Sequence, residues 1–449
     1  MRRKTWLFLV AVITLVAGAG WWAARPPAEP WSSDNREAIA AFTEGMELKD
    51  KVYVLESVER FREALEHDPE FVAARLMLAS SLAALGQKEA AKEESERALK
   101  ADPSKLVGQE LVMWEIAKLN AEKRGDEVPA ALERFALEYP NDSYISRMLA
   151  AHYAHRYEGD KAVEWYQKTL RLAPNDGLSY NMLGYIEMSR GNFAAAEANL
   201  RRYAFIAPDQ ANPHDSLGEL YTLIGRWDDA ERELRQALEI NPRFHAAYEH
   251  LARLAALRGD AEAAERYIVQ AVDVGEMPDS SVAGLRAAVR GWAALSRGDV
   301  VSLRQTVTDP TIKGSDLDLA LLRVIAAGRS GDAAGARAAW EASREAWPEL
   351  DEKGSAPVRA MFDLMEAVVL LAEGRAAAAV DATTRADEQL TYNADKGEGI
   401  LKLVVRLFKV EALAASGRAD EARSLLGEVE AVNPAFPAAI AARAVLGNA

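Results

Sequence analysis

The sequence contains few residues whose spacing suggests chemistry. His152 and His155, with Glu158 close behind them, lie one helical turn apart, which is the spacing of a metal-binding helix face. The sequence supplies no evident third ligand for such a site. We therefore expect ordinary histidines on a helix surface, and we predict no metal ion and no other cofactor.

The tripeptide Arg-Gly-Asp, which acts as a cell-adhesion ligand in flexible loops, occurs at residues 124–126, 258–260 and 297–299. Each copy stands where one helix is expected to end and the next to begin. Glycine there supplies the left-handed residue after the first helix, and aspartate caps the N-terminus of the second. The three copies therefore predict turns between helices.

Several classes of function are disfavoured by what the 449 residues lack. The absence of cysteine removes disulfides, thiolate zinc sites, iron–sulfur clusters and cysteine nucleophiles. The sequence has no Gly-Lys-Ser/Thr phosphate loop, no Gly-x-Ser-x-Gly elbow, no His-Glu-x-x-His pair and no alternating strand pattern that could host a catalytic domain. Acidic residues outnumber basic ones by 69 to 54, which disfavours nucleic-acid binding. We predict that the protein is not an enzyme, and we infer no nucleic-acid partner and no small-molecule substrate.

The first 24 residues have the features of a transmembrane segment. Three basic residues at positions 2–4 precede an uncharged run from Thr5 to Ala24, which as a helix is long enough to span a bilayer core. Tryptophans stand at both ends of the run, and the basic cluster places the N-terminus inside. We predict a single-pass signal anchor at residues 1–24 in the inner (cytoplasmic) membrane of a bacterial host, with the rest of the chain on the periplasmic side.

A cleaved secretory signal is the alternative, because Ala17-Gly18-Ala19 has the small-x-small pattern of a cleavage site. The length of the apolar run, and the paired Trp21 and Trp22 just beyond this site, favour a retained anchor. Residues 25–34 contain three prolines and predict a short, stiff spacer that leads away from the membrane.

Prolines and glycines divide most of the remaining chain into equal units. Six prolines from Pro69 to Pro242 are separated by 34, 37, 34, 34 and 34 residues, and four glycines each follow one of these prolines by 17 residues. Because 17 residues accommodate one helix and a short turn, each unit is predicted to be a pair of antiparallel helices. Small residues in register, such as Gly218 and Ala230, let the two helices approach to about 8 Å.

On these residues the chain resembles a tetratricopeptide repeat protein. In its clearest unit, the family's pattern of small, aromatic, turn and closing residues falls on Gly218, Tyr221, Gly225, Trp227, Ala230, Ala237 and Pro242. The resemblance implies an all-α fold, in which about ten or eleven helical hairpins stack into a right-handed superhelical solenoid, and a function in protein–protein interaction.

The repeat pattern divides the chain after the spacer into four regions. Residues 35–276 are predicted to form an N-terminal repeat array, and residues 317–436 a degenerate C-terminal one. Residues 277–316 between them hold one recognisable turn, at Gly298, and predict an irregular helical junction where the solenoid kinks or loses register. Residues 437–449 are interpreted as a terminal capping helix.

Stacked hairpins form a concave surface, which in the resembling family is lined by the first helix of each repeat. Carried over residue by residue, this position predicts a partner-binding groove lined by Tyr144, Arg147, Met148, Asn181, Met182, Tyr185, Met188, Asp215, Glu219, Glu249, His250 and Arg253. Methionine and tyrosine are adaptable contacts for a partner's helix or extended peptide. The alternative is that these residues are partly covered helix positions that bind no ligand.

For two specialised functions of the family, the chain lacks the residues that the function requires. A clamp for a terminal carboxylate would need Lys and Asn where the chain has residues such as Met182 and Glu219, and a rubredoxin-like module would need cysteine. We therefore predict a non-enzymatic, membrane-anchored scaffold or assembly factor that binds a segment of a partner protein, similar to anchored repeat proteins of bacterial envelope assembly. The alternatives are a soluble, exported chaperone-like binder and an accessory subunit of an enzyme that a partner supplies.

Overall fold

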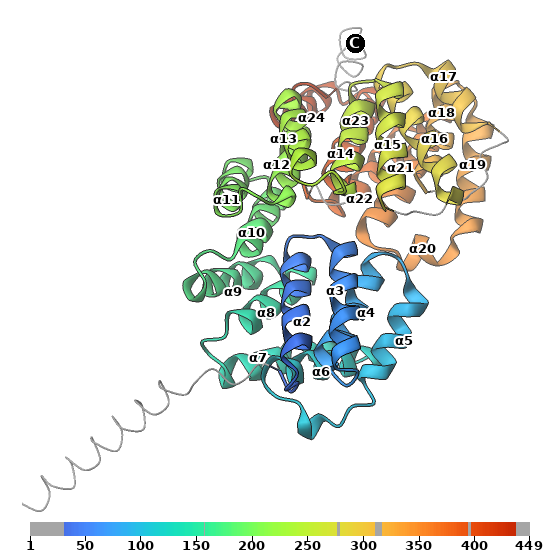
Figure 1. Ribbon diagram of the computed structural model, residues 1–449. Helices are drawn as coiled ribbons and strands as arrows, with labels where there is room; N and C mark the ends of the chain where they lie inside the picture. Colours follow the sequence, from blue (N-terminus) through green and yellow to red (C-terminus); the bar gives the residue numbers. More distant parts are fainter. Residues whose placement is uncertain (1–30, 157, 276–278, 310–316, 394–396, 437–449) are drawn as a thin grey trace, which may run out of the picture. The chain divides into compact units, whose positions relative to one another are not determined.

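The computed structural model describes residues 31–436, apart from residues 157, 276–278, 310–316 and 394–396 (Figure 1). All regular structure in these described residues is helical, and they contain no strand. Among them, no helix combines the length and the apolar character needed to cross a membrane. The predicted anchor at residues 1–24, most of the predicted spacer and the predicted capping helix at residues 437–449 lie outside the described residues.

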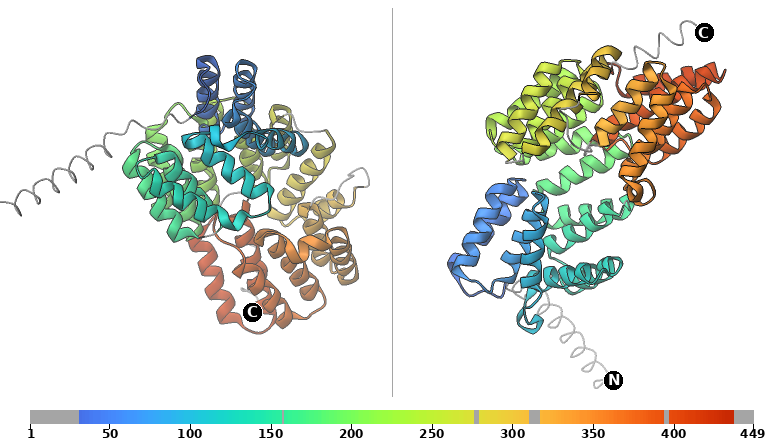
Figure 2. Two further views of the ribbon diagram at one scale, coloured as in Figure 1. Left: turned by 90° about the horizontal axis from the view of Figure 1, so that it is seen from below. Right: turned by 90° about the vertical axis from the view of Figure 1, so that its right-hand side faces the viewer.

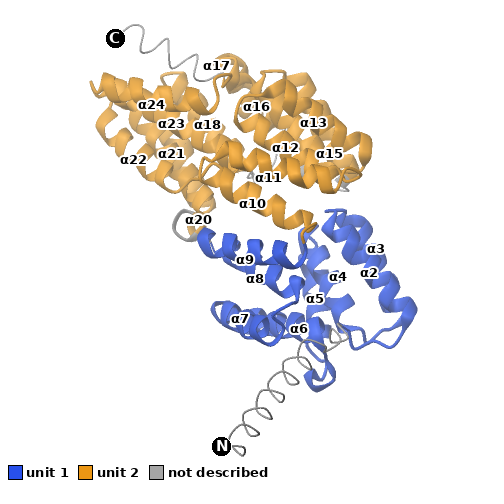
Figure 3. Cartoon of the chain, turned by 90° about the vertical axis from the view of Figure 1, so that its left-hand side faces the viewer, with its two compact units in different colours: residues 1–173 blue, residues 174–449 orange. Residues whose placement is uncertain are grey.

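The chain divides into two compact units, residues 1–173 and 174–449 (Figure 3). The α-helices described in unit 1 are α2 (Arg36–Asp50), α3 (Val54–His67), α4 (Val72–Ala84), α5 (Lys88–Ala98), α6 (Gly108–Ala121), α7 (Val128–Glu138), α8 (Ser143–His155) and α9 (Gly159–Leu172). Those described in unit 2 are α10 (Gly177–Ser189), α11 (Phe193–Ile206), α12 (Ala211–Leu223), α13 (Trp227–Ile240), α14 (His245–Leu257), α15 (Ala261–Gly275), α16 (Asp279–Ser296), α17 (Val300–Val307), α18 (Leu317–Arg329), α19 (Ala333–Ala346), α20 (Pro348–Lys353), α21 (Ala356–Ala372), α22 (Ala376–Glu388), α23 (Glu398–Ala415) and α24 (Ala419–Val432).

Consecutive helices pair as hairpins, as the sequence period predicts. In unit 2, α10 packs on α11, α12 on α13 and α14 on α15, and these hairpins stack side by side (Figure 2). The first helix of each hairpin also contacts the first helix of the next, so that α10, α12, α14 and α16 form one layer of the stack. The predicted all-helical array of hairpins is therefore confirmed, and one layer of it is made by first helices.

The turn glycines have the backbone conformation that the sequence predicts. Gly86, Gly191, Gly225 and Gly259 have φ between 75° and 78°, in the left-handed region where only glycine is free of strain. Each lies between the two helices of a hairpin. The interval of 17 residues thus marks real helix ends.

Two of the three Arg-Gly-Asp copies form the predicted capped turns. Gly259 and Gly298 have positive φ, and the aspartates that follow them accept a hydrogen bond from a backbone N–H of the next helix. The copy at residues 124–126 is different, and the prediction for its glycine was wrong. There Lys123 takes the left-handed conformation, two residues before Gly125, because Gly125 already begins a short 3₁₀-helix that leads into α7.

Small residues set the spacing of the helices within a hairpin. Ala230 is completely buried, and a Cβ atom added to Gly218 would lie 2.5 Å from Cγ of Leu234, well inside contact distance. Gly184 has the same relation to Leu200 in the preceding hairpin. These positions have no room for a larger side chain, so the packing depends on glycine and alanine at the crossing.

Candidate functional site

Three of the twelve predicted groove residues lie on α8 in unit 1. Tyr144, Arg147 and Met148 are all half-buried. Arg147 forms an ion pair of 3.2 Å with Asp50, the last residue of α2, and its guanidinium lies 5.8 Å from the centre of the Tyr144 ring. Burial raises the pKa of the Tyr144 hydroxyl, so this residue stays neutral. These side chains are thus engaged by unit 1 itself.

The other nine predicted residues lie on three neighbouring helices of one layer in unit 2. We call them the inner face of unit 2: Asn181, Met182, Tyr185 and Met188 on α10, Asp215 and Glu219 on α12, and Glu249, His250 and Arg253 on α14. None of the nine is exposed, and Asn181, Met188, Asp215 and Glu219 are buried. The structure therefore brings these residues together on one surface, but most of that surface is covered.

An ion-paired cluster lies at the centre of the inner face. Nδ1 of His250 lies 2.7 Å from Oδ1 of Asp215, and its Nε2 lies 3.1 Å from Oε1 of Glu219. The hydroxyl of Tyr185 donates a hydrogen bond of 2.5 Å to Oε2 of Glu219, and Arg253 approaches the same carboxylate at 3.7 Å. Only 5% of each acidic side chain is exposed. Three helices are thus joined by one buried charge network.

The imidazole of His250 is the cation that holds this network together. Burial alone would lower its pKa, but the two adjacent carboxylates outweigh burial and raise the pKa of His250 to about 10. Burial likewise opposes ionisation of Glu219, yet His250, Arg253 and Tyr185 lower its pKa to about 2. Asp215 has fewer partners, so burial raises its pKa. At neutral pH the histidine is therefore charged and binds two carboxylates.

The same three residues offer a set of possible metal ligands. One ligand atom from each of Asp215, Glu219 and His250 lies within 4.8 Å of the other two. A metal ion, however, needs a ring nitrogen with a free lone pair. Both ring nitrogens of a protonated His250 carry hydrogens and face a carboxylate, so the arrangement fits an ion-pair network better than a metal centre.

This network is not apparent from the repeat pattern of the sequence. Its members come from three different repeats, and the contacts join equivalent or nearly equivalent positions: Tyr185 and Glu219 are 34 residues apart, and Asp215 and His250 are 35. The sequence does contain a signal that could have revealed the network, namely residues of complementary charge that lie one repeat length apart. The sequence places His250 in the groove but not in a charge network, and the histidines that it considers for a metal site lie elsewhere: His152 is half-buried, His155 is exposed, and Glu158 pairs with Arg156 and Lys161.

The inner face is covered by residues that lie much later in the same unit. The amide of Asn433 donates hydrogen bonds to the carbonyl oxygens of Thr222 (3.3 Å) and Leu223 (2.8 Å) at the end of α12. The ring of Tyr392 packs edge-on against Phe193, with 5.5 Å between the centroids, and its backbone N–H lies 3.5 Å from the carbonyl oxygen of Ser189.

Ile400 covers the charge network directly. It encloses, with residues that include Glu219, His250 and Arg253, a void of only about 10 Å³. We call Tyr392, Ile400 and Asn433 the covering residues. They add to the burial of α12, which also packs between α10, α11, α13 and α14: twelve of its thirteen residues are buried, whereas only three of the fourteen in its hairpin partner α13 are.

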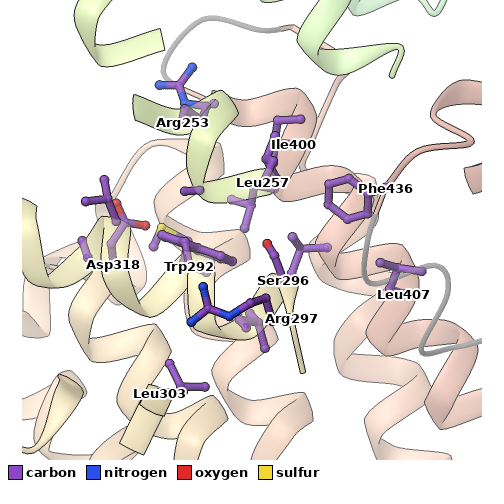
Figure 4. Close-up of a pocket in the computed structure, with 18 of the residues that line it drawn as sticks. Arg253, Leu257, Trp292, Ser296, Arg297, Leu303, Asp318, Ile400, Leu407 and Phe436 are labelled. Atoms are coloured by element: carbon purple, nitrogen blue, oxygen red, sulfur yellow. The ribbon is translucent and has the colours of Figure 1, made fainter. Parts of the chain in front are cut away.

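Beside this covered region, unit 2 encloses a large cavity of about 840 Å³ (Figure 4). Its walls come from α14, α15, α16, α17, α18, α21 and α23, together with Phe436. Most of its lining is aliphatic or aromatic, with Leu257, Trp292, Ile400 and Leu407 among the residues shown. A cavity of this size and composition is typical of a site for an apolar ligand.

Comparisons with known proteins identify the repeats. The model of a tetratricopeptide repeat family matches residues 56–109, and a second model with the same description matches residues 224–278. These segments make up about a quarter of the chain. No curated protein matches the chain in sequence.

Several solved structures are similar to parts of the chain. PilF of Pseudomonas aeruginosa is 16% identical, with a TM-score of 0.35, and the match covers 46% of this chain and 92% of that one. MamA of Desulfovibrio magneticus RS-1 is 18% identical, with a TM-score of 0.33, and covers 40% and 98%. A Cut9–Hcn1 complex of the APC/C is 14% identical, with a TM-score of 0.41, and covers 92% and 84%.

Tetratricopeptide repeats are helical hairpins that generally mediate protein–protein interaction or assembly. The predicted period, the glycine turns and the two matching family models agree on the same helical pairs. The chain contains tetratricopeptide repeats, in an all-helical array.

Proposed function

We propose that the protein is a non-enzymatic scaffold or assembly factor that binds a segment of a partner protein on the inner face of unit 2. The partner segment takes the place of the covering residues. One observation carries this proposal: the inner face already holds polypeptide, because Ile400 lies against Glu219, His250 and Arg253. Beside it, Asn433 donates hydrogen bonds to the backbone at the end of α12, and Tyr392 contacts the end of α10. A surface that holds one chain segment in this way has the chemistry to hold another.

The chemistry of the inner face favours a segment with both apolar and cationic groups. Met182 and Tyr185 are half-buried and offer apolar contact on α10. Glu249 on α14 makes no ion pair with another described residue, and it adds a negative charge near Arg253. A partner residue that displaces Ile400 would therefore meet apolar side chains on one helix and a carboxylate on another.

A charge placed on α10 should weaken partner binding strongly. Met182→Glu is expected to lower recovery of the partner with the affinity-purified protein by on the order of tenfold, because it removes an apolar contact and adds a desolvated carboxylate. The measurement is quantitative mass spectrometry of proteins recovered from the host. Ala198→Glu on α11, at an exposed position of the same hairpin, is the matched control. Equal recovery with Met182→Glu and Ala198→Glu would rule out the inner face as the binding surface.

We also propose that the protein is held in the inner membrane by residues 1–24, with both units on the periplasmic side. The support is the uncharged run of twenty residues behind a basic cluster, flanked by tryptophans. In this arrangement the scaffold would act on partners at the outer surface of the membrane.

Membrane extraction tests the anchor. After treatment of host membranes with alkaline carbonate, the full chain is expected in the pellet, whereas a variant with Leu9→Arg and Ile13→Arg should move to the soluble fraction, because each arginine disfavours insertion by roughly 2.5–3.5 kcal/mol. A mature protein that begins at or after Gly20, or a wild-type chain that is extracted by carbonate, would instead support the cleaved signal and a soluble exported binder.

A further inference from the structure

The cavity of unit 2 is elongated. Its lining runs along α16 from Leu285 to Arg297, which at the helical rise is about 18 Å, and along α23 from Gly397 to Glu411, which is about 21 Å. The two helices are on different walls of the same space. The cavity is thus long relative to its volume of about 840 Å³.

The polar groups of the cavity are largely satisfied by the protein itself. Arg329 pairs with Glu411 at 2.6 Å, Glu398 accepts hydrogen bonds from the backbone and hydroxyl of Thr391, and Arg297 donates to the carbonyl of Gly259. The remaining surface is mostly made of Leu, Ile, Val, Ala, Met, Phe and Trp side chains. Few donors and acceptors are therefore left for a ligand.

This composition discriminates between classes of occupant. An extended peptide would bring unsatisfied backbone groups into an apolar space, which costs free energy for each group. An α-helix satisfies its own backbone, but with its side chains it is about 10–12 Å across, much wider than an aliphatic chain. An aliphatic chain has no polar groups, and one leaflet of a bilayer core shows that such a chain extends about 15 Å. The cavity fits the aliphatic chain best.

Arg253 supplies a site for a head group at one end of the cavity. Within the described part of the chain its charged partner is Glu219, at 3.7 Å, which is too long for a hydrogen bond, and that carboxylate is already bound by His250 and Tyr185. Glu249 lies one helical turn before Arg253 on the same wall and forms no ion pair with it. The guanidinium therefore has donors to spare for an anion.

We propose that this cavity binds a free long-chain fatty acid, with the aliphatic chain between α16 and α23 and the carboxylate at Arg253. The site adjoins the inner face: Glu249 and Arg253 belong to both, and Ile400 lines the cavity as well as covering the charge network. The tests below use the chain without a partner, so their outcome does not depend on partner binding. It replaces the expectation from sequence that the protein has no small-molecule ligand.

Trp292 provides a direct probe, because it lines the cavity (Figure 4). The bromine atoms of 9,10-dibromostearate should quench Trp292 when this fatty acid binds to the full, delipidated chain. Quenching of Trp292 by the bound fatty acid should saturate as the cavity fills, and this saturable quenching should be lost in the Trp292→Phe variant. Any quenching of tryptophans elsewhere in the chain should remain. Quenching that is the same in both proteins would overturn the assignment of the ligand to the cavity.

Filling the cavity should block the ligand without unfolding the protein. Ala288→Phe on α16 and Val404→Phe on α23 each place a ring in the empty space from different walls. Both variants are expected to abolish the saturable quenching, and circular dichroism identifies which of them keeps the wild-type helicity. If a folded filling variant binds dibromostearate as tightly as the wild type, the proposal is wrong.

The head-group assignment has its own test. Arg253→Gln should weaken binding about tenfold, the usual effect of losing a charged hydrogen bond, and methyl dibromostearate, which lacks the charge, should bind the wild type about as weakly. Arg258→Gln, at the residue that directly follows this helix and lies outside the cavity lining, should bind like the wild type. Glu249→Gln should bind at least as tightly.

Saturable quenching only by brominated phospholipid vesicles, and not by the free acid, would overturn the fatty-acid proposal in favour of a membrane lipid.

Discussion

Replacement of His250 by leucine is expected to lower the free energy of unfolding by about 3–5 kcal/mol, because it leaves two buried carboxylates without their shared cation. Asp215 and Glu219 each have only 5% of their side chain exposed, and the imidazole lies within 3.1 Å of both. Urea-induced unfolding near pH 6, followed by circular dichroism, measures the effect. His245→Leu, on the same helix but outside the network, is the matched control.

Removal of the carboxylate charges should rescue this variant. Adding Asp215→Asn and Glu219→Gln to His250→Leu is expected to restore much of the lost stability, since no unpaired charge then remains buried. If His250→Leu unfolds at the same urea concentration as the wild type, or if the added substitutions destabilise it further, the network does not act as a buried set of ion pairs.

The wild-type protein should show the matching dependence on pH. A pKa of His250 raised from 6.5 to about 10 gives stability that is complete below pH 6.5 and is lost as the pH rises towards 10. A pKa of Glu219 lowered from 4.5 to about 2 gives stability that is present above pH 4.5 and is lost as the pH falls towards 2. The raised pKa of Asp215 acts in the opposite sense to that of Glu219, because stability is lost as this carboxyl ionises with rising pH. The contribution of the network is therefore greatest between about pH 4.5 and 6.5, and His250→Leu should remove the alkaline limb.

A larger residue at the crossing of α12 and α13 should have the second large effect. Ala230→Leu is expected to destabilise the protein by about 1–3 kcal/mol, because Ala230 is completely buried and its carbonyl oxygen would lie 3.4 Å from a Cβ atom on Gly218. Thermal unfolding detects this as a lower midpoint. Gln236→Leu, at an exposed position on the same helix, should leave the midpoint unchanged. A midpoint for Ala230→Leu equal to that of the wild type would contradict the close crossing of the helices.

The sequence predicts the repeated parts of this fold well, because their signals are local. Gly191 and Gly225 end helices where the 17-residue interval places them, and Gly218 and Ala230 meet at the crossing that their register implies. Each of these features depends on residues within one repeat of one another. The error at Arg-Gly-Asp 124–126 has a local cause as well, because a 3₁₀-helix begins at Gly125 and the left-handed residue is Lys123.

Whether the inner face is covered could not be predicted from such local signals. Periodicity places Asp215, Glu219, His250 and Arg253 on one surface, but it does not show that Asn433, more than 200 residues later, caps α12 with its side chain. Whether Asn433 reaches α12 depends on the number of repeats between them, because these repeats determine where the chain returns. The cavity is equally non-local, because it is lined by seven helices and exists where no side chain fills the space between them.

The central claim, that a partner segment and the covering residues compete for the inner face, can be tested with a reversible lock. The chain has no cysteine, so Ser189→Cys and Tyr392→Cys introduce a single pair of thiols. The backbone nitrogen of Tyr392 lies 3.5 Å from the carbonyl oxygen of Ser189, so the two positions are neighbours, and titration of free thiols measures whether the disulfide closes. Partner recovered with this variant is measured by quantitative mass spectrometry before and after oxidation, with Ser189→Cys alone as the control. We predict that oxidation closes the disulfide and prevents recovery of the partner, and that reduction restores it. A closed disulfide with undiminished partner recovery would contradict the claim.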